Sequence, residues 1–388
     1  MKLTLKLLTL FLAVLCSTPR VVIYNKLSPI IESEEKSKTP NEKEKKVIIG
    51  VLTLPLSTVL RNKMAKQLID NRIINSHEDM LSYFMDASYF PSSYSKWLKE
   101  RGADVLPIDI NDDLYSILEA VEAVDGLLLT GGAVPIYLHE KSFENEDDFS
   151  SVMELRQPSF YTRIIKEIIK LIKTINDKKQ RVYPIWATCL GFESLVLNES
   201  SLDISLDRVH NENYNSPLEL KPNADIEQTR FYQYFAKSPN AFSQMTGGNP
   251  FFFNHENGFI ESHFARNEYL RNNYHVIATA TTKHKTNQRI VAVIENKHYP
   301  IFGVQFHPEK NKYEHHASVI ANREQETLEL CDQMANMFLS QIKKGRNRKM
   351  LQLQNWILQE RSMRYTLYVE TNVGVFDEIY FFKKNGAN

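Results

Sequence analysis

Three short stretches of this sequence hold the residue types from which a covalent catalyst is built. In the first, Cys189 follows the apolar run Val182–Trp186 and precedes a helix-like run that starts at Leu190. A sharp strand-to-helix turn here would hold the sulfur clear of the backbone, and the amino end of a helix favours thiolate over thiol. Taken alone, this stretch fits better a cysteine that merely packs at the start of a helix.

The second stretch is Gly303–Lys310, which reads GVQFHPEK. In an extended chain, residues two apart point the same way, so Glu309 can lie beside His307 and orient its imidazole. A thiol next to such a histidine is an activated nucleophile. The alternative is a surface turn in which His-Pro-Glu only caps the next segment.

The third stretch is the pair Gly131-Gly132, which follows an apolar run. Glycines allow backbone N–H groups to approach a ligand closely, as an oxyanion site requires. The amide of Leu190 would be the second donor. A simple Gly-Gly turn is the alternative, but the conjunction of all three stretches is much harder to obtain by chance.

Strands and helices alternate along the part of the chain that must position these residues. Apolar runs predict strands, and apolar residues at helical spacing predict helices. The predicted strands are 47–54, 104–108, 126–130, 181–186 and 301–306, and the predicted helices are 92–101, 113–124, 157–175 and 326–339. This order favours βαβ units and an α/β fold, a three-layer α/β/α sandwich with a mostly parallel central sheet. In such sheets reactive groups gather at the carboxyl ends of the strands.

The charge balance bears on nucleic acid as a partner, and the cysteine count leaves one cysteine as a candidate nucleophile. The 388 residues contain 47 basic and 47 acidic side chains, so charge gives no argument for nucleic acid as a partner. If Cys16 leaves with a signal segment, Cys189 and Cys331 remain. Cys331 lies in the predicted helix 326–339 and is expected to be a buried core thiol rather than half of a disulfide.

The amino terminus has the pattern of a targeting segment. Lys2 and Lys6 precede the apolar run Leu7–Cys16, which is shorter than the ~20 residues that cross a bilayer but suits a secretory signal. A buried first strand is the alternative. We predict a signal peptide over 1–18, a charged linker or pro-segment over 19–46, and a catalytic domain over 47–388. We expect no stable membrane span, and a secreted, lysosome-like or vacuolar location.

The chain resembles the γ-glutamyl hydrolases, cysteine peptidases of the class I glutamine amidotransferase-like superfamily that trim folate polyglutamates. The resemblance runs from about residue 47 to the carboxyl terminus. Its stretches are Ser93–Val105, Gly131-Gly132, Trp186–Glu193, Asn254-His255, Gly303–Lys310 and Val375–Phe382. It implies Cys189 as nucleophile, His307 as general base and then acid, and Glu309 as the orienting carboxylate. Together with the glycine pair, it leads us to expect an oxyanion hole formed by the amides of Gly132 and Leu190.

The resemblance further implies three substrate-binding residues. Glu193 would lie beside the nucleophile, His255 would contact substrate as a second active-site histidine, and Tyr89 would line the cleft. Glutamine amidotransferases usually carry Gln where this chain has Glu193. The chain departs from the family at Thr130–Ala133, where Pro-Gly-Gly-Ser is usual, and at Ala187, where glycine is usual. An insertion around residues 67–80 has no counterpart.

The expected substrate is a small molecule or peptide with γ-linked glutamates, and no metal or organic cofactor is called for. A tail rich in carboxylates calls for cations, and Arg61, Lys63 and Lys96 lie in the resembling part of the chain. The pair His315-His316 lacks further ligands at zinc spacing and is interpreted as a surface pair. Asn198 begins the acceptor sequon Asn-Glu-Ser and is expected on the surface. A glutamine amidotransferase and an inactive binding relative are the alternatives, and a homodimer stays open.

Overall fold

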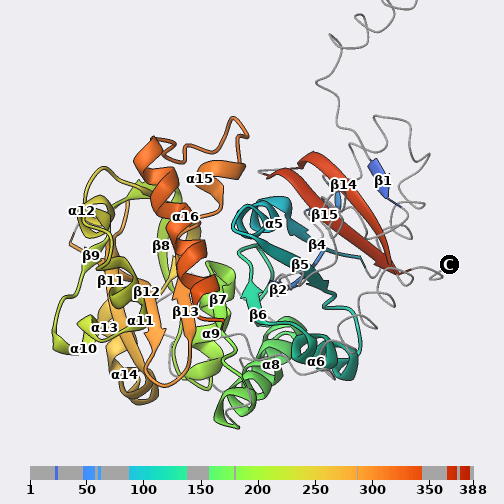
Figure 1. Cartoon of the computed structure of the whole chain (residues 1–388), viewed down its shortest axis with the longest axis horizontal. Coiled ribbons are helices and arrows are strands. Elements are labelled where there is room, and N and C mark those ends of the chain that lie inside the picture. The colour runs from blue at the N-terminus through green and yellow to red at the C-terminus, as the bar shows by residue number, and fades with distance from the viewer. Residues whose placement is uncertain are drawn as a thin grey trace, which may run out of the picture.

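Figure 1 shows a computed structural model of the whole chain. The structure describes residues 22–24, 47–56, 60–62, 87–137, 157–178, 181–285, 287–342, 365–373 and 376–384. The predicted signal peptide 1–18, most of the charged segment 19–46, Lys63 and the insertion 67–80 lie outside these residues.

An eight-stranded sheet forms the centre of the fold, in the order β5-β2-β6-β7-β13-β12-β11-β9. Its first five strands pair in parallel and the remaining pairs are antiparallel. The bounds are β2 Val47–Leu52, β5 Ala103–Ile108, β6 Gly126–Leu129, β7 Ile185–Thr188, β9 Glu219–Leu220, β11 Tyr274–Thr281, β12 Arg289–Asn296 and β13 Ile301–Val304. The expected mostly parallel sheet is confirmed, and β6, β7 and β13 lie side by side.

Helices cover both faces of this sheet (Figure 1). Successive residues of a strand point to opposite faces, so Leu127 and Leu129 pack in one hydrophobic cluster while Leu128 packs in another. The first cluster takes α6 (Leu114–Ala123), α8 (Phe160–Asp177) and α9 (Leu190–Glu199), and the second takes α5 (Ser92–Lys99) and α16 (Gln325–Ser340). The two clusters with the sheet between them make the expected three-layer α/β/α sandwich.

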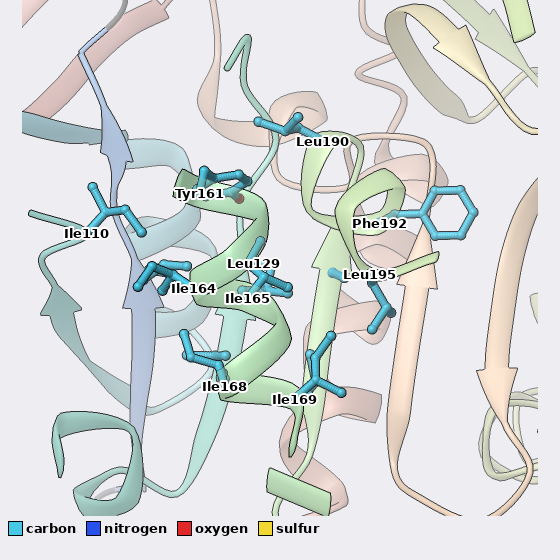
Figure 2. Packing of buried hydrophobic residues seen from close by; sticks show 14 of the residues in the cluster. Ile110, Leu129, Tyr161, Ile164, Ile165, Ile168, Ile169, Leu190, Phe192 and Leu195 are labelled. Carbon is cyan, nitrogen blue, oxygen red and sulfur yellow. The ribbon is translucent and has the colours of Figure 1, made fainter. Parts of the chain in front are cut away.

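Helix α8 shows how the sequence fixes one of these layers. Ile164, Ile165, Ile168 and Ile169 recur at helical spacing and are all 5% exposed or less, and Figure 2 shows them facing the sheet. Burial of each such side chain contributes about 1.5–3 kcal/mol. The Ser159 hydroxyl accepts from the Thr162 N–H at 3.2 Å and caps the helix. This helix packs beside α9 and so fixes the element that follows Cys189.

A second sheet, in the order β1-β14-β15-β4-β3, lies beside the first. Its bounds are β1 Val22–Tyr24, β3 Leu54–Pro55, β4 Ser88–Pro91, β14 Tyr365–Val373 and β15 Phe376–Lys384. Strands β8 (Asp207–Ser216) and β10 (Phe251–Gly258) form a two-stranded antiparallel ribbon. The remaining helices are α10 Ala224–Glu227, α11 Arg230–Phe235, α12 Ala241–Thr246, α13 Glu261–Arg266, α14 Glu268–Asn273 and α15 Lys310–Tyr313. Within the described part of the chain, no helix is both long enough and apolar enough to cross a membrane.

Some predicted details are confirmed and others are wrong. Cys331 lies in α16 as a free thiol that is only 1% exposed, as expected. The strand predicted over 181–186 begins instead at Ile185, after Pro184, whose nitrogen has no N–H to donate. The expected surface position of Asn198 is met only in part. Its side chain is half-buried, and the amide nitrogen donates to Thr162 O at 3.1 Å and Ser194 O at 2.9 Å.

Candidate active site

Cys189 occupies a sharp turn between β7 and α9. Its φ of 50° and ψ of −110° place it in a region that non-glycine residues rarely adopt, at a typical cost of about 1–3 kcal/mol. Hydrogen bonds hold the turn: the Cys189 N–H donates to Val304 O at 2.8 Å, and the Glu193 N–H donates to Cys189 O at 2.8 Å. A Cβ at Gly191 would overlap the carbonyl of Leu129, so this turn requires glycine there. The expected strand-to-helix turn is confirmed.

Burial dominates the electrostatics of the thiol. Cys189 is 5% exposed, and burial raises the pKa of its thiol well above the ordinary value, with the negative charge of Glu193 adding to the effect. The charge of Lys310 and the Leu190 N–H lower the same pKa without overcoming burial. The helix end thus favours thiolate as expected, but burial outweighs it in the free protein. A resting thiol has to lose its proton to a base before it can attack.

His307 and Glu309 form a buried pair at the end of the neighbouring strand β13. The Nδ1 atom of His307 lies 2.7 Å from Glu309 Oε1, and the exposed fractions of the two residues are 3% and 0%. Since the carboxylate accepts, Nδ1 carries the proton and Nε2 is left as the basic nitrogen. Among the described residues Nε2 has no hydrogen-bond partner. Burial lowers the pKa of His307, opposed by the charge of Glu309, so a neutral imidazole is available as a base.

The contact between His307 and Glu309 does not come from the extended backbone that the sequence suggested. Glu309 has helical backbone angles, φ −72° and ψ −27°, and α15 begins at the next residue. The chain therefore turns after His307 rather than continuing extended through Pro308. The turn brings the carboxylate back toward Nδ1, so the pairing is as expected although the extended backbone is wrong.

The Gly131-Gly132 turn joins the cysteine and the histidine in space. A Cβ built on Gly131 would lie 2.5 Å from His307 Cε1, 2.8 Å from the Tyr94 hydroxyl and 3.2 Å from Cys189 Cβ. One built on Gly132 would lie 3.6 Å from Leu190 Cδ2. The carboxyl ends of β6, β7 and β13 thus bring the three stretches together, and the backbone of Gly132 lies beside the residue whose amide is the other expected oxyanion donor.

Glu193 lies one helical turn beyond Cys189, as expected. It is 7% exposed, and its Oε1 accepts from Gln305 Nε2 at 2.8 Å. Its charge contributes to the raised pKa of the Cys189 thiol, which places the carboxylate within electrostatic reach of the sulfur. Gln305 was not predicted, although it lies two residues before His307 in the same sequence stretch.

His255 and Tyr89 both lie in buried positions around the site. His255, on β10, is 5% exposed, and its Nδ1 donates to Asn257 O at 2.6 Å. Burial lowers the pKa of His255 to about 3, and the charge of His307 also lowers it, so the ring stays neutral and is close enough to feel His307. Tyr89, on β4, is 3% exposed and its ring centroid lies 6.4 Å from that of Phe376.

Three further residues enter the site without having been predicted. Lys310 is 2% exposed, its Nζ lies 5.0 Å from the Phe376 ring centroid, and its charge lowers the pKa values of Cys189 and His307. The Tyr94 hydroxyl contacts the glycine turn. Tyr161, labelled in Figure 2, has a buried hydroxyl whose pKa is raised by burial and by the charges of Tyr89, Glu193 and Cys189. Lys310 was visible as the last letter of HPEK, and Tyr94 lies in the resembling stretch Ser93–Val105, but nothing in the sequence marked Tyr161.

The cations expected to meet a substrate already have protein partners. Arg61 Nη2 donates to Leu56 O at 3.3 Å, and Lys96 pairs with Glu378 at 3.2 Å. Of the predicted surface pair, His315 is exposed and His316 is half-buried, with its Nδ1 2.7 Å from Ser318 Oγ. No group of three or more metal-binding side chains occurs among the residues that the structure describes.

This chain matches one protein-family model and is similar in sequence to several known proteins. Residues 87–325 match the family described as glutamine amidotransferase class-I. Gamma-glutamyl hydrolase B of Dictyostelium discoideum is 26% identical over 303 residues, 78% of this chain and 73% of that protein. Gamma-glutamyl hydrolase 2 of Arabidopsis thaliana is 27% identical over 268 residues, 69% of each chain, and gamma-glutamyl hydrolase of Homo sapiens is 27% identical over 288 residues, 73% of each.

These matches confirm the resemblance and the fold that the sequence suggested. The matched residues make up more than half of the chain and include Cys189, His307 and Glu309. The chain therefore belongs to the class-I glutamine amidotransferase family.

Proposed function

We propose that this protein is a cysteine hydrolase that cleaves γ-glutamyl peptide bonds through a thioester on Cys189. The observation that carries the proposal is the meeting of Cys189, the His307–Glu309 pair and the Gly131-Gly132 turn at adjoining strand ends. The γ-glutamyl hydrolases among the relatives supply the reaction class. Folylpoly-γ-glutamates are the proposed natural substrates.

The proposed reaction has two halves, the formation of the thioester and its hydrolysis. In each half His307 takes up one proton and then returns it. The Nε2 atom takes the thiol proton as the sulfur attacks the γ-carbonyl, and the amides of Gly132 and Leu190 stabilise the oxyanion. The C–N bond breaks as Nε2 returns that proton to the leaving amine. Water, deprotonated by Nε2, then attacks the thioester and releases the acid, and the proton returns to the sulfur. Glu309 holds the imidazole in the tautomer that this sequence needs.

The remaining proposed roles concern the glutamyl group and the cleft. We place Glu193 at the α-amino group of the scissile glutamyl residue, with His255 and Tyr89 as further substrate-binding residues. These steps use protein groups alone and call for no metal or organic cofactor.

A matched pair of peptides tests the reaction class. A γ-glutamyl peptide and its α-linked isomer differ only in where the carboxylate lies relative to the scissile carbonyl. Pairing of that carboxylate and amine in a buried pocket can discriminate by up to ~10⁴-fold. We expect glutamate release from the γ-linked peptide, loss of release after iodoacetamide treatment, and a weaker γ preference in Glu193→Gln. Comparable kcat/KM values on the two isomers would refute the assignment.

A glutamine amidotransferase is the alternative favoured by the family description itself. Glu193 in the place where such enzymes usually carry glutamine is the residue that separates the two activities. Hydrolysis of free glutamine without cleavage of the γ-linked peptide would select the amidotransferase. Absence of both activities in protein that still reacts at Cys189 would select an inactive binding relative.

We also propose that the chain enters the secretory route, with a signal peptide over 1–18, a linker or pro-segment over 19–46 and a catalytic domain over 47–388. This proposal rests on the charge and apolar pattern of the amino terminus. Sequencing of the amino terminus of the protein purified from its own cells tests it. A mature protein that still begins at Met1 would contradict it.

A further inference from the structure

The hydroxyl of Tyr94 lies between the glycine turn and the histidine pair. Tyr94 belongs to α5 and is 1% exposed. The Gly131 N–H donates to its oxygen at 2.7 Å, and the oxygen lies 3.4 Å from His307 Nδ1. The charge of Glu309 also acts on this hydroxyl and raises its pKa. One buried oxygen therefore contacts two of the three segments that make the proposed site.

The directions of these hydrogen bonds follow from the available protons. The Nδ1 proton of His307 is donated to Glu309 at 2.7 Å, so Nδ1 cannot accept from Tyr94. At Gly131 it is the N–H that meets the hydroxyl, so the tyrosine oxygen accepts from the glycine turn. The same oxygen lies close enough to Nδ1 to fix the separation between that turn and the imidazole.

The position of this hydroxyl is itself held from outside the site. In the same helix, the indole Nε1 of Trp97 donates to Cys331 O in α16 at 3.0 Å. The rings of Trp97 and Trp186 have centroids 5.7 Å apart, which ties α5 to β7 as well. Burial raises the pKa of Tyr94, and the charges of Glu309 and Cys189 raise it further, so the hydroxyl stays protonated while the neighbouring groups change charge.

We propose that Tyr94 is a positioning residue that sets the spacing between the Gly131-Gly132 turn and the His307–Glu309 pair. It fixes Gly131 against both His307 and Cys189, which keeps the next amide, that of Gly132, in place for the oxyanion. The kinetic part of this inference rests on the proposed function.

Tyr94→Phe removes the hydroxyl and leaves the ring. We expect kcat to fall by about tenfold to 100-fold, since the oxyanion donor and the base are both less well placed, and KM to change by less than about threefold. The loss of one buried hydroxyl is small against the stability of a typical domain, so the variant is expected to fold.

The pH dependence separates positioning from a purely structural role. The titratable groups that face the hydroxyl are Glu309, His307 and Cys189, and the charge of Lys310 acts on the last two. The tyrosine oxygen is the negative end of a dipole 3.4 Å from His307 Nδ1, so its loss leaves the imidazolium less stabilised and lowers the pKa of His307. We expect the acid limb of kcat/KM to move to lower pH by up to about one unit.

Tyr183→Phe is the matched control. The Tyr183 hydroxyl is also fully buried and donates to Val121 O at 2.8 Å, but the residue precedes β7 at the end of the strand opposite to Cys189. We expect a similar loss of thermal stability with kcat and the pH profile unchanged. A Tyr94→Phe protein that matches wild type in kcat and in pH profile would overturn the proposal.

Alkylation of Cys189 by iodoacetamide, followed peptide by peptide on the full chain, provides a second readout that needs no substrate. We expect a slower reaction at neutral pH in Tyr94→Phe and no change in Tyr183→Phe. If the wild type releases no glutamate while the alkylation rates still separate the two variants, the positioning role stands and the hydrolase assignment fails. If glutamate release is confirmed but both variants alkylate and turn over like wild type, the positioning role alone fails.

Discussion

Replacement of Gly131 by alanine would place a methyl group among all three groups proposed to do the chemistry. The new Cβ would lie 2.5 Å from His307 Cε1, 2.8 Å from the Tyr94 hydroxyl and 3.2 Å from Cys189 Cβ. Gly131 does not have a positive φ, so alanine can adopt its backbone conformation. The effect is therefore one of contact and not of backbone strain.

The size of the effect follows from these distances. An ordinary contact for such a carbon is 3.4–4 Å, so His307 and the glycine turn must separate by about 1 Å. The ring has little freedom to move, since Nδ1 is held by Glu309 at 2.7 Å and the turn is held by Tyr94 at 2.7 Å. A misplacement of about 1 Å in reacting groups can cost about 100-fold in rate. Overpacking of this kind destabilises by about 1–3 kcal/mol.

We expect Gly131→Ala to lower kcat on the γ-linked peptide by about 100-fold or more while the protein stays folded. Thermal unfolding and glutamate release are measured on the same samples. The control is Gly247→Ala, since Gly247 is exposed at the end of α12, and the nearest atom to its Cβ would be Ser243 O at 3.3 Å. A Gly131→Ala enzyme with kcat within about threefold of wild type would refute the arrangement described for the three groups.

Two further predictions follow from the same structure. Cys189→Ala is expected to lower the rate of glutamate release by several orders of magnitude. Cys331→Ala removes a thiol that is buried in α16 and is expected to leave that rate nearly intact. Equal activity of wild type and Cys189→Ala would exclude Cys189 as the nucleophile. Burial raises the pKa of Glu314 from 4.5 to about 7, so the folded protein retains a proton there that the unfolded chain has lost. The free energy of unfolding should therefore fall as pH rises from about 4.5 to about 7, by roughly 3 kcal/mol at most. Glu314→Gln should flatten that slope in denaturant titrations across this range, and an unchanged slope would contradict the raised pKa.

The sequence carried enough local information to predict the elements that hold the nucleophile. Apolar runs of five to eight residues between amphipathic segments predicted β2, β5, β6 and β13 close to their observed bounds, since buried parallel strands are apolar on both faces. The turn at Cys189 was predictable because the small residue Gly191 allows the close approach to Leu129 that such a turn requires. Both signals lie within a few residues of the feature that they predict.

Features that depend on residues far apart in the chain could not be predicted from local sequence. The thiol pKa is set by burial beneath several elements, which outweighs the helix end that the sequence made visible. The half-buried Asn198 follows from the packing of α9 on α8, where Thr162 O accepts its amide. Tyr94 contacts Gly131, which lies 37 residues further along the chain. No neighbouring residue indicates that its hydroxyl makes this contact.

Several buried polar atoms gather in the neighbourhood of Cys189 without a partner in the protein. Among the described residues, His307 Nε2, Glu309 Oε2, His255 Nε2, Tyr161 Oη and Gln305 Oε1 are buried without a hydrogen-bond partner. Each such atom typically costs about 1–3 kcal/mol, which a fold with no use for these groups could avoid by replacing them with apolar side chains of similar shape. An apolar ligand would leave them unpaired and enclosed. Amide and amine N–H groups of a ligand would donate to the four acceptors among these atoms, and a ligand carboxylate would accept from Tyr161. These atoms therefore favour a polar substrate such as a γ-glutamyl peptide.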